Sequence, residues 1–145
     1  AWLIVVPYWL VILGSAFEYI TFQQPPSWVA AVLGVLFFAE AALVRVRAHL
    51  DLGPGFSMFL EKGEGQQVVT HGLYAHVRHP LYLANILLFI ACPLFLSVTF
   101  AWVATLLGIG GVVARINLEE RFLLAEMPGY DEYQKHTARL IPRIW

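Results

Sequence analysis

The chain has 145 residues, of which 59% are hydrophobic and only 13% are charged. An ordinary soluble domain is about 45–50% apolar and about 25% charged, and the mean hydropathy of +0.68 departs in the same direction. The net charge of −1 gives no basic surface for nucleic acid, and the single cysteine, Cys92, excludes an internal disulfide. The composition therefore predicts a single-domain integral membrane protein.

Residues 1–20 form the first apolar segment that is long enough to cross a membrane. A spanning helix needs about 20 mostly apolar residues, and this segment carries one charge, Glu18, close to its end. A signal peptide is the alternative interpretation, but no basic region precedes the segment and its apolar part is too long. We therefore expect a membrane-spanning helix here.

Residues 28–46 form the second expected span, which follows a turn at Pro25-Pro26. Glu40 lies inside this span, and an ionisable side chain within a span is expected to face the helix bundle or a polar cavity. Glu40 is therefore predicted either to point into a site or to pair with Arg45 or Arg47.

The second half of the chain contains an uncharged stretch from residue 81 to residue 114. A single helix of that length would measure about 50 Å, which is too long for one crossing. We expect a hairpin of two shorter spans, 81–96 and 98–116, with the turn near Pro93 and the 97–99 region.

The basic residues decide between these topologies, because they fall in only two regions, one before and one after the hairpin. They are Arg45, Arg47, Lys62, Arg78, Arg115, Arg121, Lys135, Arg139 and Arg143. Four spans place both regions on one side, which the positive-inside rule makes cytoplasmic. The predicted fold is therefore an all-α integral membrane protein over residues 1–145, with four transmembrane helices. A cytoplasmic loop (47–80) and tail (117–145) form a cap, and both termini are cytoplasmic.

The same side holds all five histidines, namely His49, His71, His76, His79 and His136. The loop contains glycine-rich turns and a short β-prone stretch, Gln67–Thr70. The tail is expected to continue the fourth helix until Pro128-Gly129 and then to form a short helix from Asp131 to about Ala138. Most titratable side chains are thus concentrated in the predicted cap.

Two motifs within this cap resemble those of the isoprenylcysteine carboxyl methyltransferase family. The first is VVTHGLYAHVRHPLYLA (Val68–Ala84), with its R-H-P-x-Y entry into a helix. The second combines Glu119-Glu120 with the G-Y-x-x-Y of residues 129–133 and the closing L-I-P of residues 140–142. The resemblance covers about residues 34–142. Departures occur at Ala84, where many members have Gly, and at Met127-Pro128, where members have Phe before Gly129.

The resemblance implies methyl transfer from S-adenosylmethionine to a lipophilic acceptor, most simply the carboxylate of a prenylated cysteine or of a lipid-like small molecule. A phospholipid N-methyltransferase is an alternative, because that related family shares R-H-P-x-Y and the glutamate pair. An NADPH-dependent membrane reductase of similar helical build is another alternative, although it needs basic residues for the 2′-phosphate. A non-catalytic membrane module is the third alternative. A nucleic-acid partner is not expected, and membrane lipid is.

The resemblance also assigns roles to charged residues. Glu119 and Glu120 would accept hydrogen bonds from the ammonium or ribose of the cofactor, and their position near a helix C-terminus, where the macrodipole disfavours anions, argues against a merely solvated pair. Arg78 and Arg139, which with Glu119 form the predicted catalytic set, would hold a carboxylate of cofactor or substrate. Alternatively, Arg78 is an interfacial snorkelling arginine, and Arg139 pairs with an acid.

The remaining candidates are aromatic and histidine residues that would surround the cofactor. Aromatic faces can stack on adenine or hold a sulfonium by cation–π attraction, and His79 can donate a hydrogen bond, although a structural role at the helix entry is the alternative. The cofactor-binding set predicted in this way is His71, Gly72, Tyr74, His79, Pro80, Tyr82, Glu119, Glu120, Tyr130 and Tyr133. Tyr82 is equally explained as an interfacial anchor. No metal site is expected, because Pro80 separates His79 from His76 and no H-E-x-x-H is present.

Overall fold

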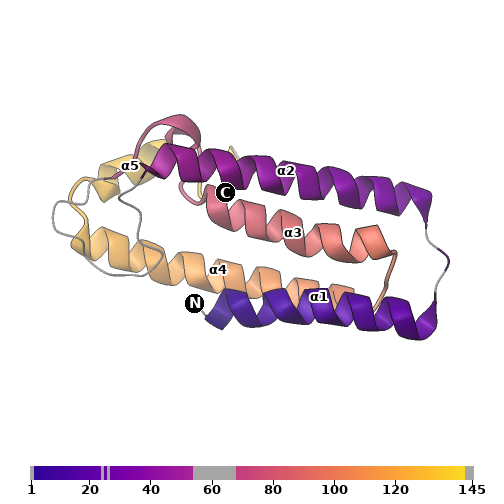
Figure 1. Ribbon diagram of the computed structural model, residues 1–145. Helices are drawn as coiled ribbons and strands as arrows, with labels where there is room; N and C mark the ends of the chain where they lie inside the picture. The colour runs from indigo at the N-terminus through magenta and orange to yellow at the C-terminus, as the bar shows by residue number, and fades with distance from the viewer. Residues whose placement is uncertain (1, 24, 26, 54–67, 143–145) are drawn as a thin grey trace.

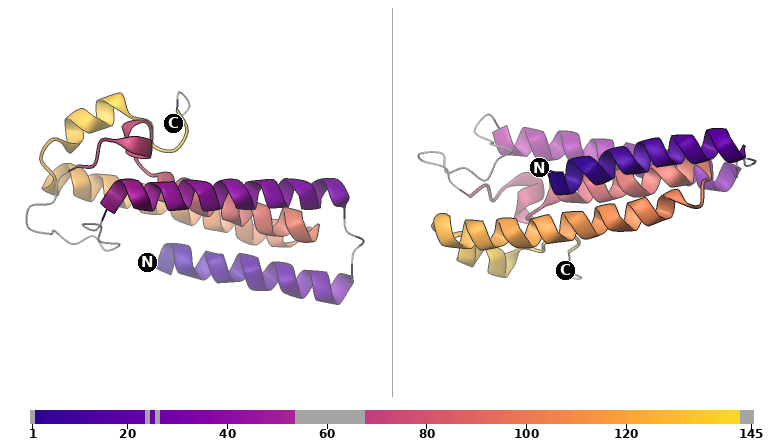
Figure 2. Two further views of the ribbon diagram at one scale, coloured as in Figure 1. Left: turned by 45° about the horizontal axis from the view of Figure 1, so that its top comes forward. Right: turned by 90° about the horizontal axis from the view of Figure 1, so that it is seen from below.

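A computed structural model describes residues 2–23, 25, 27–53 and 68–142. Its long helices are α1 (Trp2–Phe22), α2 (Trp28–Leu52), α3 (Pro80–Leu96) and α4 (Ala101–Glu126). A 3₁₀ turn, η2 (Gly72–Ala75), precedes α3, and a short helix, α5 (Tyr130–His136), follows α4. The long helices run side by side along one axis, and η2 and α5 lie at the end where α2 and α4 finish (Figures 1 and 2).

The apolar helices confirm an all-α membrane protein. Helices α1, α2 and α4 are long and apolar enough to cross a membrane, whereas α3 is a shorter apolar helix of 17 residues. At 1.5 Å per residue, α3 measures about 25 Å. The count of four spans therefore stays a prediction. Helices α2 and α4 extend past the predicted ends of their spans, at residues 46 and 116, because charged residues continue a helix once it leaves the apolar layer.

The turn between α3 and α4 lies in the predicted 97–99 region and not at Pro93, so the predicted end of the third span at residue 96 is confirmed. Pro93 is inside α3, which continues to Leu96, and Ser97 ends the helix in the left-handed conformation with φ 55°. A proline in an apolar helix is tolerated where neighbouring helices pack around it. The predicted short helix of the tail is present as α5, whereas residues 68–70 form no strand and Gln67 lies outside the described residues.

Close helix packing depends on small residues. The buried residues of α2 are Gly34, Ala41 and Ala48, spaced by seven, and they form its seam with α3. A Cβ at Gly34 would lie 2.5 Å from the backbone nitrogen of Phe95, so the two backbones approach as closely as glycine permits. Gly111 brings α4 equally close to the backbone of α1. Small residues are the usual means of close helix association in membranes.

The two acidic residues of the spans have different surroundings. The buried carboxylate of Glu18 accepts backbone N–H groups from Thr99, Phe100 and Ala101, at 2.5, 3.0 and 2.9 Å, and so caps the start of α4 from α1. Glu40 is exposed on the outside of α2, and no ion pair joins it to Arg45 or Arg47 within the described residues. The prediction for Glu40 was therefore wrong. It precedes Ala41 in the sequence and is thus turned about 100° from the seam with α3.

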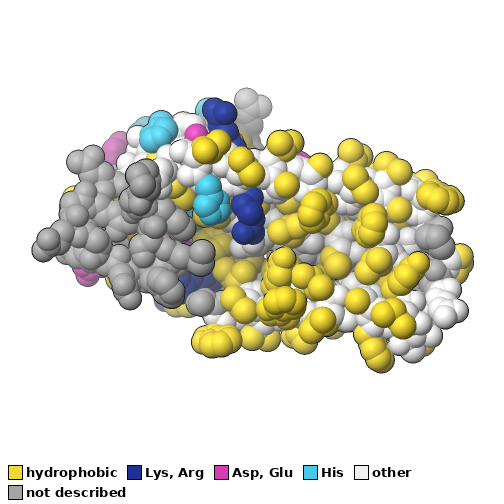
Figure 3. Space-filling view, in the orientation of Figure 1, with side chains coloured by type: hydrophobic (Ala, Val, Ile, Leu, Met, Phe, Trp, Pro, Cys, Tyr) yellow, Lys and Arg dark blue, Asp and Glu magenta, His cyan; other side chains and the backbone are white. Residues whose placement is uncertain are grey.

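The surface of the bundle has an apolar part and a polar part, which follow each other along its long axis. Large hydrophobic side chains are exposed over α1, α2 and α4, including Trp2, Trp9 and Phe38. Figure 3 shows these side chains covering most of the visible face, whereas charged and histidine side chains gather toward the end that carries α5. This distribution suits a helical bundle in lipid with a polar cap at one end.

Candidate functional site

A backbone connection brings the R-H-P motif and the tail together. Val77 and Ala138 form an isolated parallel bridge, in which Arg78 N–H donates to the carbonyl of Ala138 at 2.8 Å. The N–H of His79 donates to the carbonyl of Arg139 at 3.1 Å, and Ala138 N–H donates to the carbonyl of His76 at 3.1 Å. Two segments that are far apart in the sequence are thus fixed against each other just before α3 begins.

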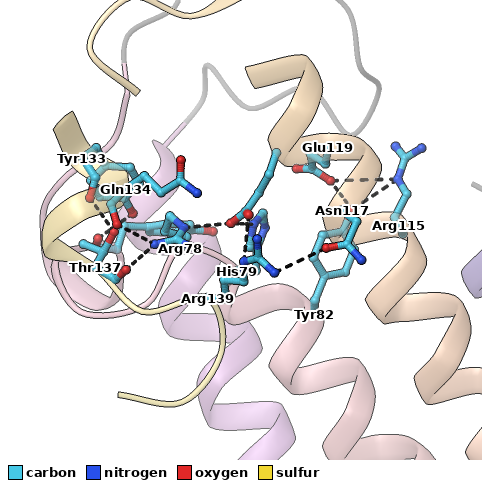
Figure 4. A network of polar contacts seen from close by, with 12 residues as sticks. Arg78, His79, Tyr82, Arg115, Asn117, Glu119, Tyr133, Gln134, Thr137 and Arg139 are labelled. Atoms are coloured by element: carbon cyan, nitrogen blue, oxygen red, sulfur yellow. Dashed lines mark hydrogen bonds and ion pairs between the residues drawn. The ribbon is translucent and has the colours of Figure 1, made fainter. Parts of the chain in front are cut away.

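Arg78 is the centre of a buried polar network (Figure 4). Its Nε donates to Glu120 Oε1 at 2.8 Å, across 42 residues of sequence. Its Nη1 donates to the carbonyls of Gln134, at 3.0 Å, and of Thr137. The side chains of Arg78 and Glu120 are only 5% and 4% exposed. The contacts of this guanidinium therefore connect α4, α5 and the start of α3.

Glu120 receives two further partners. His79 Nε2 lies 3.2 Å from Oε1, and Arg139 Nε lies 2.9 Å from Oε2. Arg139 also donates from Nη1 to Asn117 Oδ1 at 3.4 Å. A buried carboxylate with two guanidinium partners and an imidazole is compensated for its loss of water. Both oxygens of Glu120 thus face protein cations.

Glu119 lies beside this network but has a different environment. Tyr82 Oη donates to Glu119 Oε2, and Arg115 Nε lies 3.9 Å from the same oxygen. Arg115 Nε also donates to Tyr82 Oη at 3.4 Å. The Glu119 side chain is 24% exposed, and its Oε1 has no hydrogen-bond partner among the described residues. Glu119 therefore keeps one carboxylate oxygen available for a ligand.

Three tyrosines lie along the network on the η2 and α5 side. Tyr133 Oη donates to the carbonyl of Tyr74 at 2.6 Å, and the Tyr130 and Tyr133 rings are 5.8 Å apart. Burial raises the pKa of Tyr133 to about 12 and also raises the pKa of Tyr74 and of Tyr130, so all three hydroxyls keep their protons at neutral pH. The Tyr130 hydroxyl is buried without a hydrogen-bond partner in the described part of the chain. It is an unused donor next to the network.

The end of α2 supports the motif from the other side. Asp51 Oδ2 accepts the backbone N–H of Leu73 at 2.8 Å, which fixes η2 against α2. Gly72 has φ +59°, and a Cβ there would overlap the Asp51 carboxylate, so only glycine fits. His71 is exposed at the start of η2 and lies outside the network just described.

The structure brings most of the predicted site residues into one place. They are Arg78, His79, Tyr82, Glu119, Glu120 and Arg139, with Tyr74, Tyr130 and Tyr133 adjoining and Pro80 opening α3. Sequence reasoning missed Arg115, Asn117 and Asp51. Arg115 had a signal, because it is the first charge after the uncharged stretch and lies one turn before Glu119. Within the described ranges, no three His, Cys, Asp or Glu side chains gather as a metal site would require.

The sequence pattern of the isoprenylcysteine carboxyl methyltransferase (ICMT) family matches residues 32–125, which are 94 of the 145 residues. The chain belongs to the ICMT family. The matched region contains α3, most of α2 and α4, and the network residues Arg78, His79, Glu119 and Glu120.

The chain is also similar to one solved structure and to one curated protein. The structure of a eukaryotic intramembrane Ras methyltransferase, ICMT, superposes with a TM-score of 0.81 at 27% identity, over 94% of this chain and 52% of the other. A nickel-cobalt-cadmium resistance protein, NccN, of Alcaligenes xylosoxydans xylosoxydans is 26% identical over 126 residues, which are 84% of this chain and 55% of that protein. The chain therefore spans about half the length of both relatives.

Proposed function

We propose that this ICMT-family protein is an integral membrane methyltransferase that uses S-adenosylmethionine and methylates the carboxylate of an isoprenylcysteine-type lipid. The observation that carries the proposal is the pair Glu119 and Glu120. Glu120 is neutralised inside the protein by Arg78 and Arg139, whereas Glu119 presents a free oxygen beside it. Family membership and the likeness to a Ras methyltransferase support the reaction class.

The residues at the site fit the chemistry of the cofactor. Glu119 Oε1 would accept from its ammonium or a ribose hydroxyl, and the unpartnered Tyr130 hydroxyl would donate to it. The ring faces of Tyr74 and Tyr82 suit adenine or a sulfonium. His71, Gly72 and Pro80 would border the cofactor through the backbone of η2 and the start of α3.

Arg78, His79 and Glu120 receive a different role in this proposal. Their charged atoms already contact one another, so we assign them to positioning rather than to direct contact with a ligand. Arg139 is 30% exposed in its side chain and also pairs with Glu120, and it would be the network's point of contact with bound substrate.

When bound, S-adenosylmethionine supplies an electrophilic methyl group, so that a carboxylate oxygen of the acceptor bonds to this carbon as the carbon–sulfur bond breaks and its electron pair stays on sulfur. An ionised carboxylate needs no base, whereas a lipid amine has to lose a proton. His79 is turned toward Glu120, so its imidazole does not have the position of a free base, and the open oxygen of Glu119 is assigned to the cofactor in this proposal. This favours a carboxylate acceptor over the phospholipid amine. Positioning then supplies most of the rate enhancement.

The proposed topology places the site and both termini on the cytoplasmic side. Its support is the concentration of Lys and Arg in the loop and tail. The cofactor would then enter from water through the cap, and the lipophilic acceptor would enter sideways from the bilayer between the apolar helices.

Calorimetric binding of S-adenosylhomocysteine to the detergent-purified protein tests the cofactor assignment. Saturable binding is expected for the wild type and for Glu132→Ala, which removes an exposed glutamate of α5. Glu119→Ala is expected to abolish it. NADPH serves as the comparison ligand. Binding of NADPH in place of S-adenosylhomocysteine would contradict the methyltransferase proposal and favour the reductase alternative. Methyl ester formation on N-acetyl-S-farnesylcysteine, compared with phosphatidylethanolamine, then tests the acceptor.

A further inference from the structure

Arg45 is a half-buried arginine near the cytoplasmic end of α2 whose charge has no acidic partner in the described part of the chain. Its Nη2 donates to Asn85 Oδ1 on α3, and its Nε is buried without any hydrogen-bond partner among the described residues. A guanidinium that is partly removed from water without an anion is costly, and an ionisable side chain at such a place in a membrane protein indicates a functional site.

The other described arginines either have an acidic partner or, as Arg121, are exposed. Arg78 and Arg139 pair with Glu120, and Arg115 lies 3.9 Å from a Glu119 oxygen. Arg47, two residues after Arg45, is 68% exposed in its side chain and still pairs with Asp51. A snorkelling arginine points its guanidinium into water, whereas Arg45 turns Nη2 toward Asn85 on α3 and its Nε is buried.

An apolar cavity lies between α1, α2 and α3, and Arg45 and Asn85 follow its lining residues along α2 and α3 toward the cap. The cavity has a volume of about 360 Å³, and its lining includes Gly34 and Phe38 from α2 and Leu88 and Cys92 from α3. Phe38 and Arg45 are seven residues apart, as are Asn85 and Cys92, so in each helix the polar residue shares a face with the lining. The same seam therefore changes from apolar to polar toward the cap.

The two ends of this seam fit one amphiphilic molecule. Along α3, Leu88 lies about 4.5 Å and Cys92 about 10 Å from Asn85 at 1.5 Å per residue. On the other side, Tyr82, which binds Glu119, lies one helical turn from Asn85. Helices α1 and α2 make little contact with each other over their described residues, and Figure 3 shows a hollow between them that a histidine and a basic side chain border.

We propose that Arg45 and Asn85 form the carboxylate-binding site for the methyl acceptor, whose apolar chain occupies the cavity between α1, α2 and α3. This proposal rests on the proposed function and names the residues that select its acceptor. Asn85 orients the guanidinium through Oδ1 and leaves its own NH₂ group to donate to the carboxylate. The Arg45 guanidinium would supply a charge-assisted hydrogen bond to the same carboxylate. Methylation turns the carboxylate into a neutral ester, so the ion pair exists with substrate and is lost with product.

The test measures binding of N-acetyl-S-farnesylcysteine and of its methyl ester, with S-adenosylhomocysteine present, to protein in phosphatidylcholine nanodiscs. The wild type is expected to bind the acid about tenfold more tightly than the ester, the equivalent of one good charge-assisted contact. Arg45→Gln is expected to remove this preference while S-adenosylhomocysteine affinity stays unchanged. Arg47→Gln, which removes a neighbouring exposed charge, is the matched control and keeps the preference.

Two further variants keep the test decisive. Asn85→Ala is expected to reduce the acid preference about threefold, because it removes one neutral contact and frees the guanidinium. Arg45→Lys retains charge but not the planar fork, and an intermediate preference is expected. The proposal is overturned if Arg45→Gln and Asn85→Ala, both still binding S-adenosylhomocysteine, retain the full preference for the acid.

An anionic lipid headgroup is the competing occupant of the Arg45 site. If Arg45 holds such a headgroup, nanodiscs that contain phosphatidylglycerol will abolish the acid preference of the wild type and of Arg47→Gln alike, and this result overturns the proposal. A preference that persists in phosphatidylglycerol and is lost only in Arg45→Gln supports the acceptor site. Failure of the proposed function looks different, because the wild type itself would then bind no S-adenosylhomocysteine or form no methyl ester from the acid.

Discussion

The two adjacent glutamates are predicted to differ sharply when each is replaced by glutamine. Glu120→Gln neutralises a side chain that is 4% exposed and leaves Arg78, 5% exposed, without its anion. Removing one partner of a buried ion pair costs about 3–5 kcal/mol. Glu119 has one hydrogen bond from Tyr82 and an ion pair at 3.9 Å, and it is 24% exposed, so Glu119→Gln is expected to cost about 1 kcal/mol or less.

Thermal unfolding in detergent, followed by tryptophan fluorescence, and calorimetry with S-adenosylhomocysteine measure the two effects separately. Glu120→Gln is expected to lower Tm by about 6–20 °C, at about 2–4 °C per kcal/mol for a domain of this size. Glu119→Gln is expected to leave Tm nearly unchanged and to weaken binding by tenfold or more. Equal losses of Tm for the two variants would refute the assignment of a structural role to Glu120 and a ligand role to Glu119.

Three other predictions follow from the packing and the topology. Glu18→Ala removes the carboxylate that accepts three N–H groups at the start of α4 and is expected to cost about 3 kcal/mol, measured as a lower Tm; an unchanged Tm would contradict the capping role. Gly34→Leu is expected to separate α2 from α3 and lower Tm, whereas Gly14→Ala, with nothing within 4 Å of the added Cβ, is the neutral control. In Lys135→Cys, a membrane-impermeant maleimide is expected to label α5 in inverted vesicles but not in intact cells, with the native Cys92 in α3 unlabelled in both; labelling of intact cells would reverse the proposed sidedness.

The fold was predictable to the extent that apolar length and charge position determine it. The uncharged stretch from 81 to 114 predicted a hairpin, and α3 and α4 form one. The turn lies in the predicted 97–99 region, whereas Pro93 does not end the helix, because α3 packs against its neighbours and continues to Leu96. The prediction for Glu40 failed for a related reason, since the orientation of its side chain depends on which face of α2 packs against α3.

The site was predictable in composition but not in connectivity. The motifs placed Arg78, Glu119 and Glu120 at one end of the bundle, as the structure has them. They did not indicate that Arg78 binds Glu120 and the carbonyls of α5 rather than a ligand, because that depends on the parallel bridge between Val77 and Ala138. Local spacing contains no information about a pairing across 42 residues.

The remaining unpaired groups show how the two proposals fit together. A low-dielectric site penalises every buried charge that has no partner, so charges left open in the protein indicate the charges of the ligands. Among the described residues, Glu119 Oε1 has no hydrogen-bond partner, and Arg45 is joined to Asn85, which lies one turn of α3 from Tyr82. A cationic methyl donor and an anionic acceptor would neutralise these two groups respectively. Transfer of the methyl group would turn the acceptor's carboxylate into a neutral ester, which weakens the binding of the methylated product at Arg45 and favours its release.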